Sequence, residues 1–281
     1  MEIKEKMGKD ANIQYRESKN EDGTLRKKKM GKLEEVRKKR REDTPEEKPP
    51  SPDKFGGLWM DVRLGKNIMN TLWDNINTSK RTEEENANSK LAGNISESWF
   101  IKDKDNWLME NVLKECCDYM FFKESWTNYY NVRVSKAVDP PVYVLDEYWV
   151  NYQKQTEFNP PHMHSGMWSF VIFMKIPTHY KEQHALPISA NSNAPCVSDF
   201  QFWPPNMNTT SRTEANYALS AKDEGRMLFF PAWLVHQVFP FYGTEEERVT
   251  VSGNILIKNN APLSFEIEMD EKESDSQNIH W

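Results

Sequence analysis

The sequence contains little cysteine: there are three in 281 residues, and two of them, Cys116 and Cys117, are adjacent. No CxxC pair occurs. An odd count with one adjacent pair is a poor basis for a disulfide framework and suits a reducing compartment. We therefore expect Cys116, Cys117 and Cys196 to be small, buried, apolar side chains.

Long hydrophobic runs are also missing. No stretch of 18 apolar residues occurs, so no segment is expected to span a membrane. The first ten residues, MEIKEKMGKD, lack the apolar centre of a signal peptide. Together these absences predict a soluble protein of the cytoplasm.

Charge is distributed unevenly along the chain. Residues 1–55 carry 17 Lys/Arg and 13 Asp/Glu, a net charge of +4, whereas residues 56–281 carry 20 and 30, a net charge of −10. An acidic body argues against broad binding of nucleic acid through its phosphates. Only the basic run at 26–41 fits nucleic acid or an acidic partner, and such runs are more often solvated tails.

Composition predicts three regions. Residues 1–55 have too little apolar surface to offset the entropy lost on ordering, so we expect a disordered, charged extension. Residues 56–263 are long enough to bury a core and are predicted to form one domain. Residues 264–281 are expected to be an acidic tail.

Two helices are predicted at the start of the domain. The first follows a strand or loop near residue 60, and its apolar residues recur at helical spacing: Ile68, Met69, Leu72, Trp73 and Ile76. The second is expected within 103–122, with Asp103 or Asp105 as its N-cap. Two helices ahead of a β-rich half favour helices packed on the outside of a sheet.

From residue 142 the pattern changes to short aromatic and β-branched segments, at 142–153, 168–177, 196–203, 225–241 and 248–257. Polar connections separate them, and the long ones are expected to lie over a site. This spacing is typical of a jelly roll or sandwich. The predicted fold class is mainly β with flanking helices (α+β).

Three of the six histidines stand in a pattern that favours metal binding. His162 and His164 are two residues apart between two predicted strands, and in an extended segment such residues point the same way. His236 lies in another apolar, strand-like run. Two ligands from one turn and a third from a distant strand are the layout of a facial metal triad.

Other interpretations of the histidines remain open at this point. Each could be an ordinary hydrogen-bonded side chain. A closed structural zinc site would need four ligands, with Cys196 as the fourth, but the spacing of Cys196 does not support it.

Arg248 is a further candidate site residue, which could bind a carboxylate ligand. It follows His236 by twelve residues, and we expect a hairpin to return it beside His236. A buried arginine needs an anion, and its planar fork matches a carboxylate. The alternative is an ordinary ion pair with Glu245, Glu246 or Glu247.

Taken together, the segments NPPHMHSG, SFVIFMKIP, GRMLFFPAWLVHQVFPF and ERVTVSGNI resemble the 2-oxoglutarate/Fe(II)-dependent oxygenase superfamily. The resemblance covers roughly residues 85–258 and is greatest to prolyl-hydroxylase-like members of bacteriophages and bacteria. It implies a cupin-like double-stranded β-helix. For a phage protein, the compartment would be the host cytoplasm.

The resemblance also implies ligands and roles. Iron would be bound by His162, His164 and His236, and the distal carboxylate of 2-oxoglutarate by Arg248. Weaker candidates for binding this co-substrate are Thr250, Tyr152 and Asn151. The implied cofactors are Fe(II), 2-oxoglutarate and O₂, with ascorbate as an accessory reductant, and the implied reaction is hydroxylation of an unknown substrate, such as a protein side chain. Trp149, Phe170, Phe173, Phe230 and Trp233 would line the cavity or simply form core.

The sequence departs from the family at His164, because the family usually has a metal-binding acid there. Either three histidines bind the iron, or a carboxylate from elsewhere replaces His164, with Asp199 as the nearest candidate. Two rival functions remain: a metal cupin of another activity, such as an isomerase or thiol dioxygenase, and a jelly-roll binding or virion protein without activity. The oligomeric state is not readable from the sequence.

Overall fold

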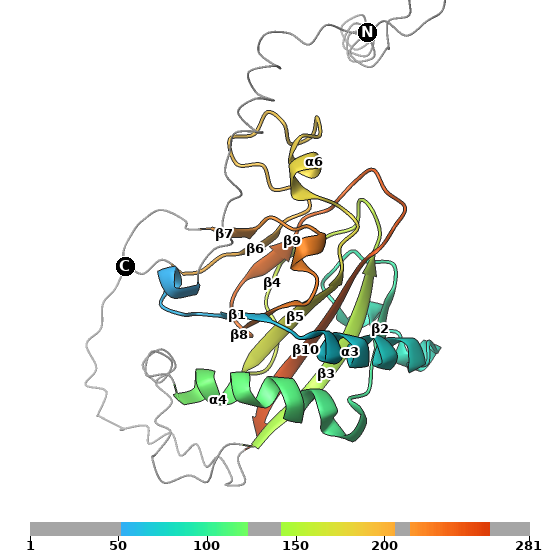
Figure 1. The fold of residues 1–281 in the computed structure, drawn as a ribbon, viewed down its shortest axis with the longest axis vertical. Helices are drawn as coiled ribbons and strands as arrows, with labels where there is room; N and C mark the ends of the chain where they lie inside the picture. The colour runs from blue at the N-terminus through green and yellow to red at the C-terminus, as the bar shows by residue number, and fades with distance from the viewer. Residues whose placement is uncertain (1–51, 123–141, 206–213, 259–281) are drawn as a thin grey trace, which may run out of the picture. The chain divides into compact units, whose positions relative to one another are not determined.

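Two antiparallel β-sheets build the chain's fold in the computed structural model, which describes residues 52–122, 142–205 and 214–258 (Figure 1). These residues belong to one compact unit that begins at Pro49. The predicted extension 1–55 and tail 264–281 fall almost wholly outside the described residues and stay predictions. None of the helices in the described segments could cross a bilayer.

The larger sheet has six strands in the order β1-β8-β5-β10-β3-β2. Their bounds are β1 Met60–Arg63, β8 Arg226–Pro231, β5 Trp168–Lys175, β10 Arg248–Lys258, β3 Val142–Gln153 and β2 Ser98–Phe100. The smaller sheet has four strands in the order β4-β9-β6-β7. Their bounds are β4 Asn159–His162, β9 His236–Val238, β6 Phe200–Phe202 and β7 Ala215–Tyr217.

The order of strands along the chain identifies the topology. From β3 to β10 the chain passes back and forth between the two sheets, and every pairing within each sheet is antiparallel. This alternation winds the chain into a double-stranded β-helix, the form of jelly roll predicted above. The predicted fold class is confirmed.

One sequence prediction about connectivity is wrong. We expected β9 and β10 to form a hairpin that returns Arg248 beside His236. Instead β9 pairs with β4 and β6, whereas β10 pairs with β3 and β5 in the other sheet. The segment after His236 is therefore a crossover between sheets.

The helices cover the outer face of the larger sheet, as Figure 1 shows for α3 (Lys66–Thr78) and α4 (Lys114–Phe122). Leu72 and Ile76 of α3 pack with Met120 of α4 against strand residues such as Val249 and Val251. The helices contribute apolar residues at helical spacing, and the strands contribute apolar residues at alternate positions. Together they form one continuous core. The predicted placement of the helices outside a sheet is confirmed.

The second predicted helix is interrupted. It comprises a 3-10 turn at Lys104–Asn106, a π-helical turn at Met109–Leu113, and then α4. The Asp103 carboxylate caps it, because it accepts hydrogen bonds from the backbone N–H groups of Leu108 (2.8 Å) and Met109 (3.1 Å). Asp105 instead adopts a positive φ of 55°.

The remaining short helices lie outside the sheets. They are η1 Pro52–Phe55, η2 Glu83–Glu85, η3 Asn88–Lys90, α6 Tyr180–His184 and η6 Ala221–Asp223. A second apolar cluster, which includes Val171, Phe173, Phe200 and Phe230, lies between the two sheets. The three cysteines are free, with Cys116 and Cys117 buried and Cys196 partly exposed.

Candidate metal centre

Neighbouring strands of the smaller sheet bring His162 and His236 together. His162 ends β4, His236 begins β9, and the two residues are direct partners in the β4–β9 register. His164 lies just beyond β4, where its backbone N–H donates to the Ala232 carbonyl at 2.8 Å. This bond ties the loop after β4 to the turn before β9, so that His164 faces the other two histidines.

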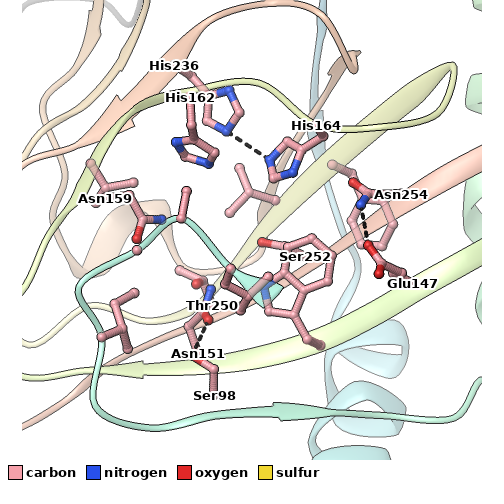
Figure 2. A pocket seen from close by; sticks show the side chains of 18 of the residues that line it. Ser98, Glu147, Asn151, Asn159, His162, His164, His236, Thr250, Ser252 and Asn254 are labelled. Atoms are coloured by element: carbon pink, nitrogen blue, oxygen red, sulfur yellow. Dashed lines mark hydrogen bonds between the residues drawn. The ribbon is translucent and has the colours of Figure 1, made fainter. Parts of the chain in front are cut away.

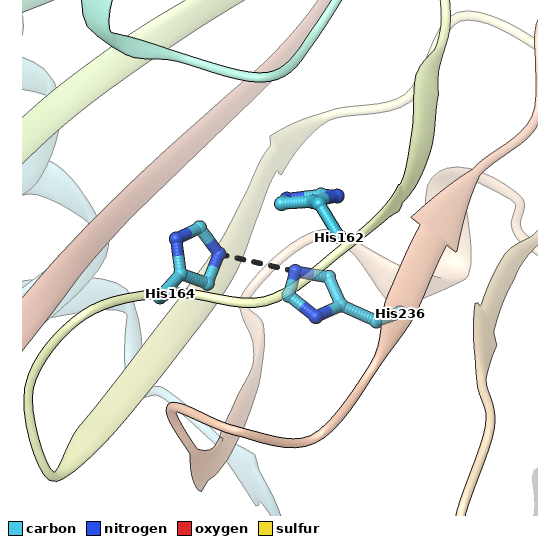
Figure 3. A group of neighbouring side chains, drawn as sticks. All are labelled: His162, His164 and His236. Carbon is cyan, nitrogen blue, oxygen red and sulfur yellow. Dashed lines mark hydrogen bonds between the residues drawn. The ribbon is translucent and has the colours of Figure 1, made fainter.

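The three imidazoles converge on one point (Figure 3). Their ring centroids lie 4.3 Å apart for His162 and His236, and 4.9 Å apart for each of the other two pairs. One ring nitrogen from each lies within 4.8 Å of the other two. The predicted meeting of these residues is confirmed, and among the described residues no other group of three histidines, cysteines or acids could hold a metal ion.

Hydrogen bonds define the tautomers of two histidines. The Nδ1 atom of His162 lies 2.7 Å from the Pro160 carbonyl, and that of His236 lies 2.9 Å from the Leu234 carbonyl. A carbonyl only accepts, so Nδ1 carries the proton in both rings. Each Nε2 therefore keeps its lone pair, which is the arrangement typical of metal-binding histidines.

The separation of the nitrogen atoms also fits a metal ion. Nε2 of His164 lies 3.1 Å from Nε2 of His236. Two adjacent ligands at right angles, each about 2.1 Å from one metal ion, are themselves about 3 Å apart. The separation of this pair thus fits two ligands of one ion.

Burial keeps the imidazoles neutral. Desolvation lowers the pKa of His236 well below its usual value, with the neighbouring histidines adding to the effect. Burial, and then the proximity of His162, lowers the pKa of His164 to about 3. Burial also lowers the pKa of His162. All three rings are therefore uncharged at neutral pH, as metal ligands must be.

The histidines open into a cavity of about 180 Å³ whose wall is formed by β3 and β10 (Figure 2). Along these paired strands, four cross-strand pairs share the inward-facing parity: Glu147 with Asn254, Trp149 with Ser252, Asn151 with Thr250, and Gln153 with Arg248. The Trp149 ring lies 5.8 Å from that of His164, centroid to centroid. The histidines therefore stand over the middle of this wall.

Arg248 ends this row but does not itself line the cavity. Its guanidinium is fully buried, and Nη2 donates to the carbonyl (2.8 Å) and hydroxyl (2.7 Å) of Ser198. Nη1 lies 3.5 Å from Oε1 of Gln153, which does line the cavity. The alternative of a surface ion pair with the adjacent glutamates is wrong, because Arg248 has no exposed surface.

Arg248 also retains capacity for a ligand. Within the described residues its Nε–H has no hydrogen-bond partner. Burial lowers the pKa of Arg248 to about 10, while the charge of Asp199 acts in the opposite direction. The side chain is thus a buried cation at neutral pH with an unused donor, which is the property required to hold a carboxylate.

Two of the weaker candidates line the cavity and one does not. Asn151 and Thr250 face it from paired positions on β3 and β10. The prediction for Tyr152 is wrong: it has the opposite strand parity, packs in the core beneath the helices, and its hydroxyl accepts a hydrogen bond from Arg81 at 2.8 Å. Adjacent residues of a strand cannot both face one cavity.

Asp199 is not brought to the histidines. Its Oδ1 lies 2.8 Å from Nε2 of His184, and the metal-binding group does not include it. The structure thus offers no support for Asp199 as an iron ligand. Cys196, the conceivable fourth ligand of a zinc site, is likewise outside the group.

Sequence reasoning missed several polar residues of the cavity, namely Ser98, Glu147, Gln153, Asn159, Ser252 and Asn254. Strand parity was the available signal. Once Asn151 is assigned to the cavity, Glu147 and Gln153 must face the same way, and the same argument extends from Thr250 to Ser252 and Asn254. Of the five predicted aromatic wall residues, Trp149, Phe170, Phe173 and Phe230 line the cavity, whereas Trp233 packs against the core between the sheets.

The fold and the site together are a double-stranded β-helix with three converging histidines that could hold a metal ion. Residues 147–254 match the sequence model of a family described as "Putative 2OG-Fe(II) oxygenase". This segment contains all three histidines and Arg248. The part of the chain that holds the site thus matches the 2-oxoglutarate/Fe(II)-dependent oxygenases, a family of oxidoreductases that use Fe(II), 2-oxoglutarate and O₂.

Solved structures to which the chain is similar include a prolyl-4-hydroxylase of Pseudomonas putida, at 10% identity and a TM-score of 0.36, over 74% of this chain and 97% of that one. Another is an oxidoreductase of the 2OG-Fe(II) oxygenase family from Burkholderia pseudomallei, at 12% identity and a TM-score of 0.28, over 52% and 60% of the two chains. No curated protein matches the sequence.

Proposed function

We propose that this protein hydroxylates a C–H bond of its substrate at an iron ion held by His162, His164 and His236, with oxidative decarboxylation of 2-oxoglutarate. The observation that carries the proposal is the convergence of three neutral imidazoles, two of which have their tautomers fixed by backbone carbonyls. When bound, the iron supplies the activation of O₂ that forms succinate, CO₂ and the hydroxylated product.

Three histidines would give this site a distinctive charge. The triad contributes no negative charge, whereas the family's usual set of two histidines and an acid contributes one. The two carboxylates of 2-oxoglutarate would therefore provide the main charge compensation for the ion. We infer that the co-substrate and the metal strengthen each other's binding here.

Arg248 and Thr250 are proposed to orient 2-oxoglutarate. Thr250 faces the cavity on the same strand as Arg248, two residues nearer the histidines. The guanidinium lies behind Gln153, so the distal carboxylate would reach it by displacing the Gln153 amide. Asn151 would help at this end of the wall, because its Oδ1 accepts from the Ser98 hydroxyl (2.8 Å) and its amide nitrogen is directed to the cavity (Figure 2).

The cavity wall beyond these residues is proposed to exclude water from the reaction. The rings of Trp149 and Phe230 lie 5.8 Å and 6.4 Å from that of His164, centroid to centroid, and give the histidines apolar surroundings. A dry, shaped site of this kind protects a reactive centre from side reactions. The protein's own contribution is thus the orientation of ligands and the exclusion of solvent.

The test is formation of succinate from 2-oxoglutarate by the full chain, with and without added Fe(II). We expect turnover that requires Fe(II), stops with a chelator and is absent in His236→Ala. Tight zinc binding without consumption of 2-oxoglutarate would favour a metal cupin of another activity. A chain that binds no metal would favour a non-enzymatic jelly roll.

A further inference from the structure

We infer that the substrate carries a positively charged nitrogen group, an ammonium or guanidinium, and that Glu147 binds it. This inference rests on the proposed function and adds the chemical class of the substrate. It starts from Glu147, the one acidic side chain that lines the cavity within the described residues.

Glu147 is held in place by a chain of buried polar groups. Its Oε2 accepts a hydrogen bond from Nδ2 of Asn254 at 2.8 Å, and Oδ1 of Asn254 accepts one from the Ser169 hydroxyl at 2.9 Å. Asn254 and Ser169 are almost completely buried, with exposed fractions of 3% and 1%. The Ser169 hydroxyl therefore orients the Asn254 amide, and the Asn254 amide orients the Glu147 carboxylate.

No cation of the described chain neutralises Glu147. The ion pairs among the described residues do not include it. The lysine that lines the same cavity, Lys90, places its Nζ 5.2 Å from the ring centre of Phe100. The Asn254 amide gives Glu147 a hydrogen bond but no charge, and a carboxylate in a cavity is stabilised most by a cationic partner, so an incoming cationic ligand is the natural candidate.

The position of Glu147 separates it from the co-substrate end of the cavity. In Figure 2, Thr250 and Asn151 lie on one side of Ser252, and Asn254 with Glu147 lies on the other. Arg248 ends the row on the Thr250 side. The wall is thus bipolar: donors and a cation at one end suit the anionic co-substrate, and a carboxylate at the other suits a cation.

The strand register also indicates how far Glu147 lies from the histidines. Trp149, whose ring lies 5.8 Å from that of His164, is two residues from Glu147 on β3. Two residues of an antiparallel strand span roughly 7 Å. A substrate whose cationic group lies several bonds from the reacting carbon would therefore bridge Glu147 and the histidines, as a lysine-like or arginine-like side chain does.

The local backbone supports a specific role for this end of the wall. The β3–β10 register shifts after Asn254, because Asn254 pairs with Glu147 but Ile255 pairs with Leu145. An irregularity of this kind re-aims side chains and is common beside active sites. Here it falls directly beside the Glu147–Asn254 pair.

The experiment uses the full chain, loaded anaerobically with Fe(II) and 2-oxoglutarate, and measures the affinity for matched probes by calorimetry. The probes are N-acetyl-lysine methylamide against its norleucine counterpart, and N-acetyl-arginine methylamide against its citrulline counterpart. We expect at least one cationic probe to bind about tenfold or more tightly than its neutral match. In Glu147→Gln, which keeps the side-chain shape, this preference should fall to within about twofold.

The control is Glu110→Gln, which alters an exposed glutamate paired with Lys114 and should leave the preference unchanged. The affinity for 2-oxoglutarate should be the same in parent and Glu147→Gln, because its proposed anchor is at the other end of the wall. Equal binding of both members of each pair by the parent, including no binding of any probe, overturns the inference, as does a preference that survives in Glu147→Gln. Failure of the parent to bind 2-oxoglutarate contradicts the proposed function instead, and the probes are then compared on the chain without it.

Discussion

His164 occupies the position at which related enzymes have a metal-binding acid, and its Nε2 lies 3.1 Å from Nε2 of His236. If it binds iron, His164→Ala should weaken Fe(II) binding at least about tenfold, since one of three ligands is lost. His164→Asp restores a carboxylate at the same position and should retain iron and some turnover. Anaerobic Fe(II) titration of both variants measures this.

One outcome would exclude His164 as an iron ligand. If His164→Ala binds Fe(II) as tightly as the parent and consumes 2-oxoglutarate at the same rate, the residue does not bind the metal. The search for a third ligand would then move beyond the described group, which contains no acid.

Arg248 tests the assignment of the co-substrate end. Arg248→Lys keeps the charge but cannot form the two parallel hydrogen bonds of a guanidinium, so the affinity for 2-oxoglutarate should fall more than about tenfold. Arg248→Ala is less informative, because removing a fully buried side chain bonded to Ser198 also destabilises the fold. Calorimetric titration of 2-oxoglutarate into the Fe(II)-loaded variant provides the measurement.

A matched control for this variant is Arg81→Lys. Arg81 bonds Glu97 and Tyr152 outside the cavity, so its replacement should leave 2-oxoglutarate binding unchanged. An Arg248→Lys variant with the parent's affinity would show that Arg248 only supports the fold through Ser198.

At the scale of elements, β10 carries much of the site, because it contributes Arg248, Thr250, Ser252 and Asn254 to one face. Gly253 allows this strand to approach its neighbours closely: an added Cβ would lie 2.6 Å from the Glu147 carbonyl and 2.8 Å from the Phe170 ring. Gly253→Ala should therefore lower the free energy of unfolding by about 1–3 kcal/mol.

Urea unfolding of Gly253→Ala measures that change, with Gly65→Ala as the control. Gly65 precedes α3 and has open space where a Cβ would stand, so its replacement should change stability by less than about 0.5 kcal/mol. Equal stability of the two variants would contradict the close packing of β10 against β3 and β5.

The side to which a strand residue points could be predicted from the sequence, whereas the pairing of the strands could not. Parity placed His162 and His164 on one side and Val249 and Val251 in the core, because alternation along a strand is a local rule. The partner of each strand is a long-range property, so the hairpin expected between β9 and β10 was wrong. The prediction that Tyr152 binds the co-substrate was wrong for a simpler reason. Tyr152 is adjacent to Asn151 in β3, so it must face the opposite side of the sheet.

At the scale of the whole molecule, the first 48 residues of the charged N-terminal extension are predicted to be dispensable. The compact unit begins at Pro49, and Phe55 packs 5.0 Å from the ring of Trp59. A chain that starts at Pro49 keeps this contact and should show the parent's melting temperature and 2-oxoglutarate turnover. Loss of either would show that the first 48 residues support the enzyme domain.

The central claim is that His162, His164 and His236 hold one iron ion. The measurement that tests it most directly is anaerobic titration of Fe(II), in the presence of 2-oxoglutarate, into the parent and the single variants His162→Ala and His236→Ala. The account predicts one Fe(II) per parent chain and a loss of most binding in each variant, with 2-oxoglutarate turnover abolished. Parent-like stoichiometry and affinity in either variant would contradict it.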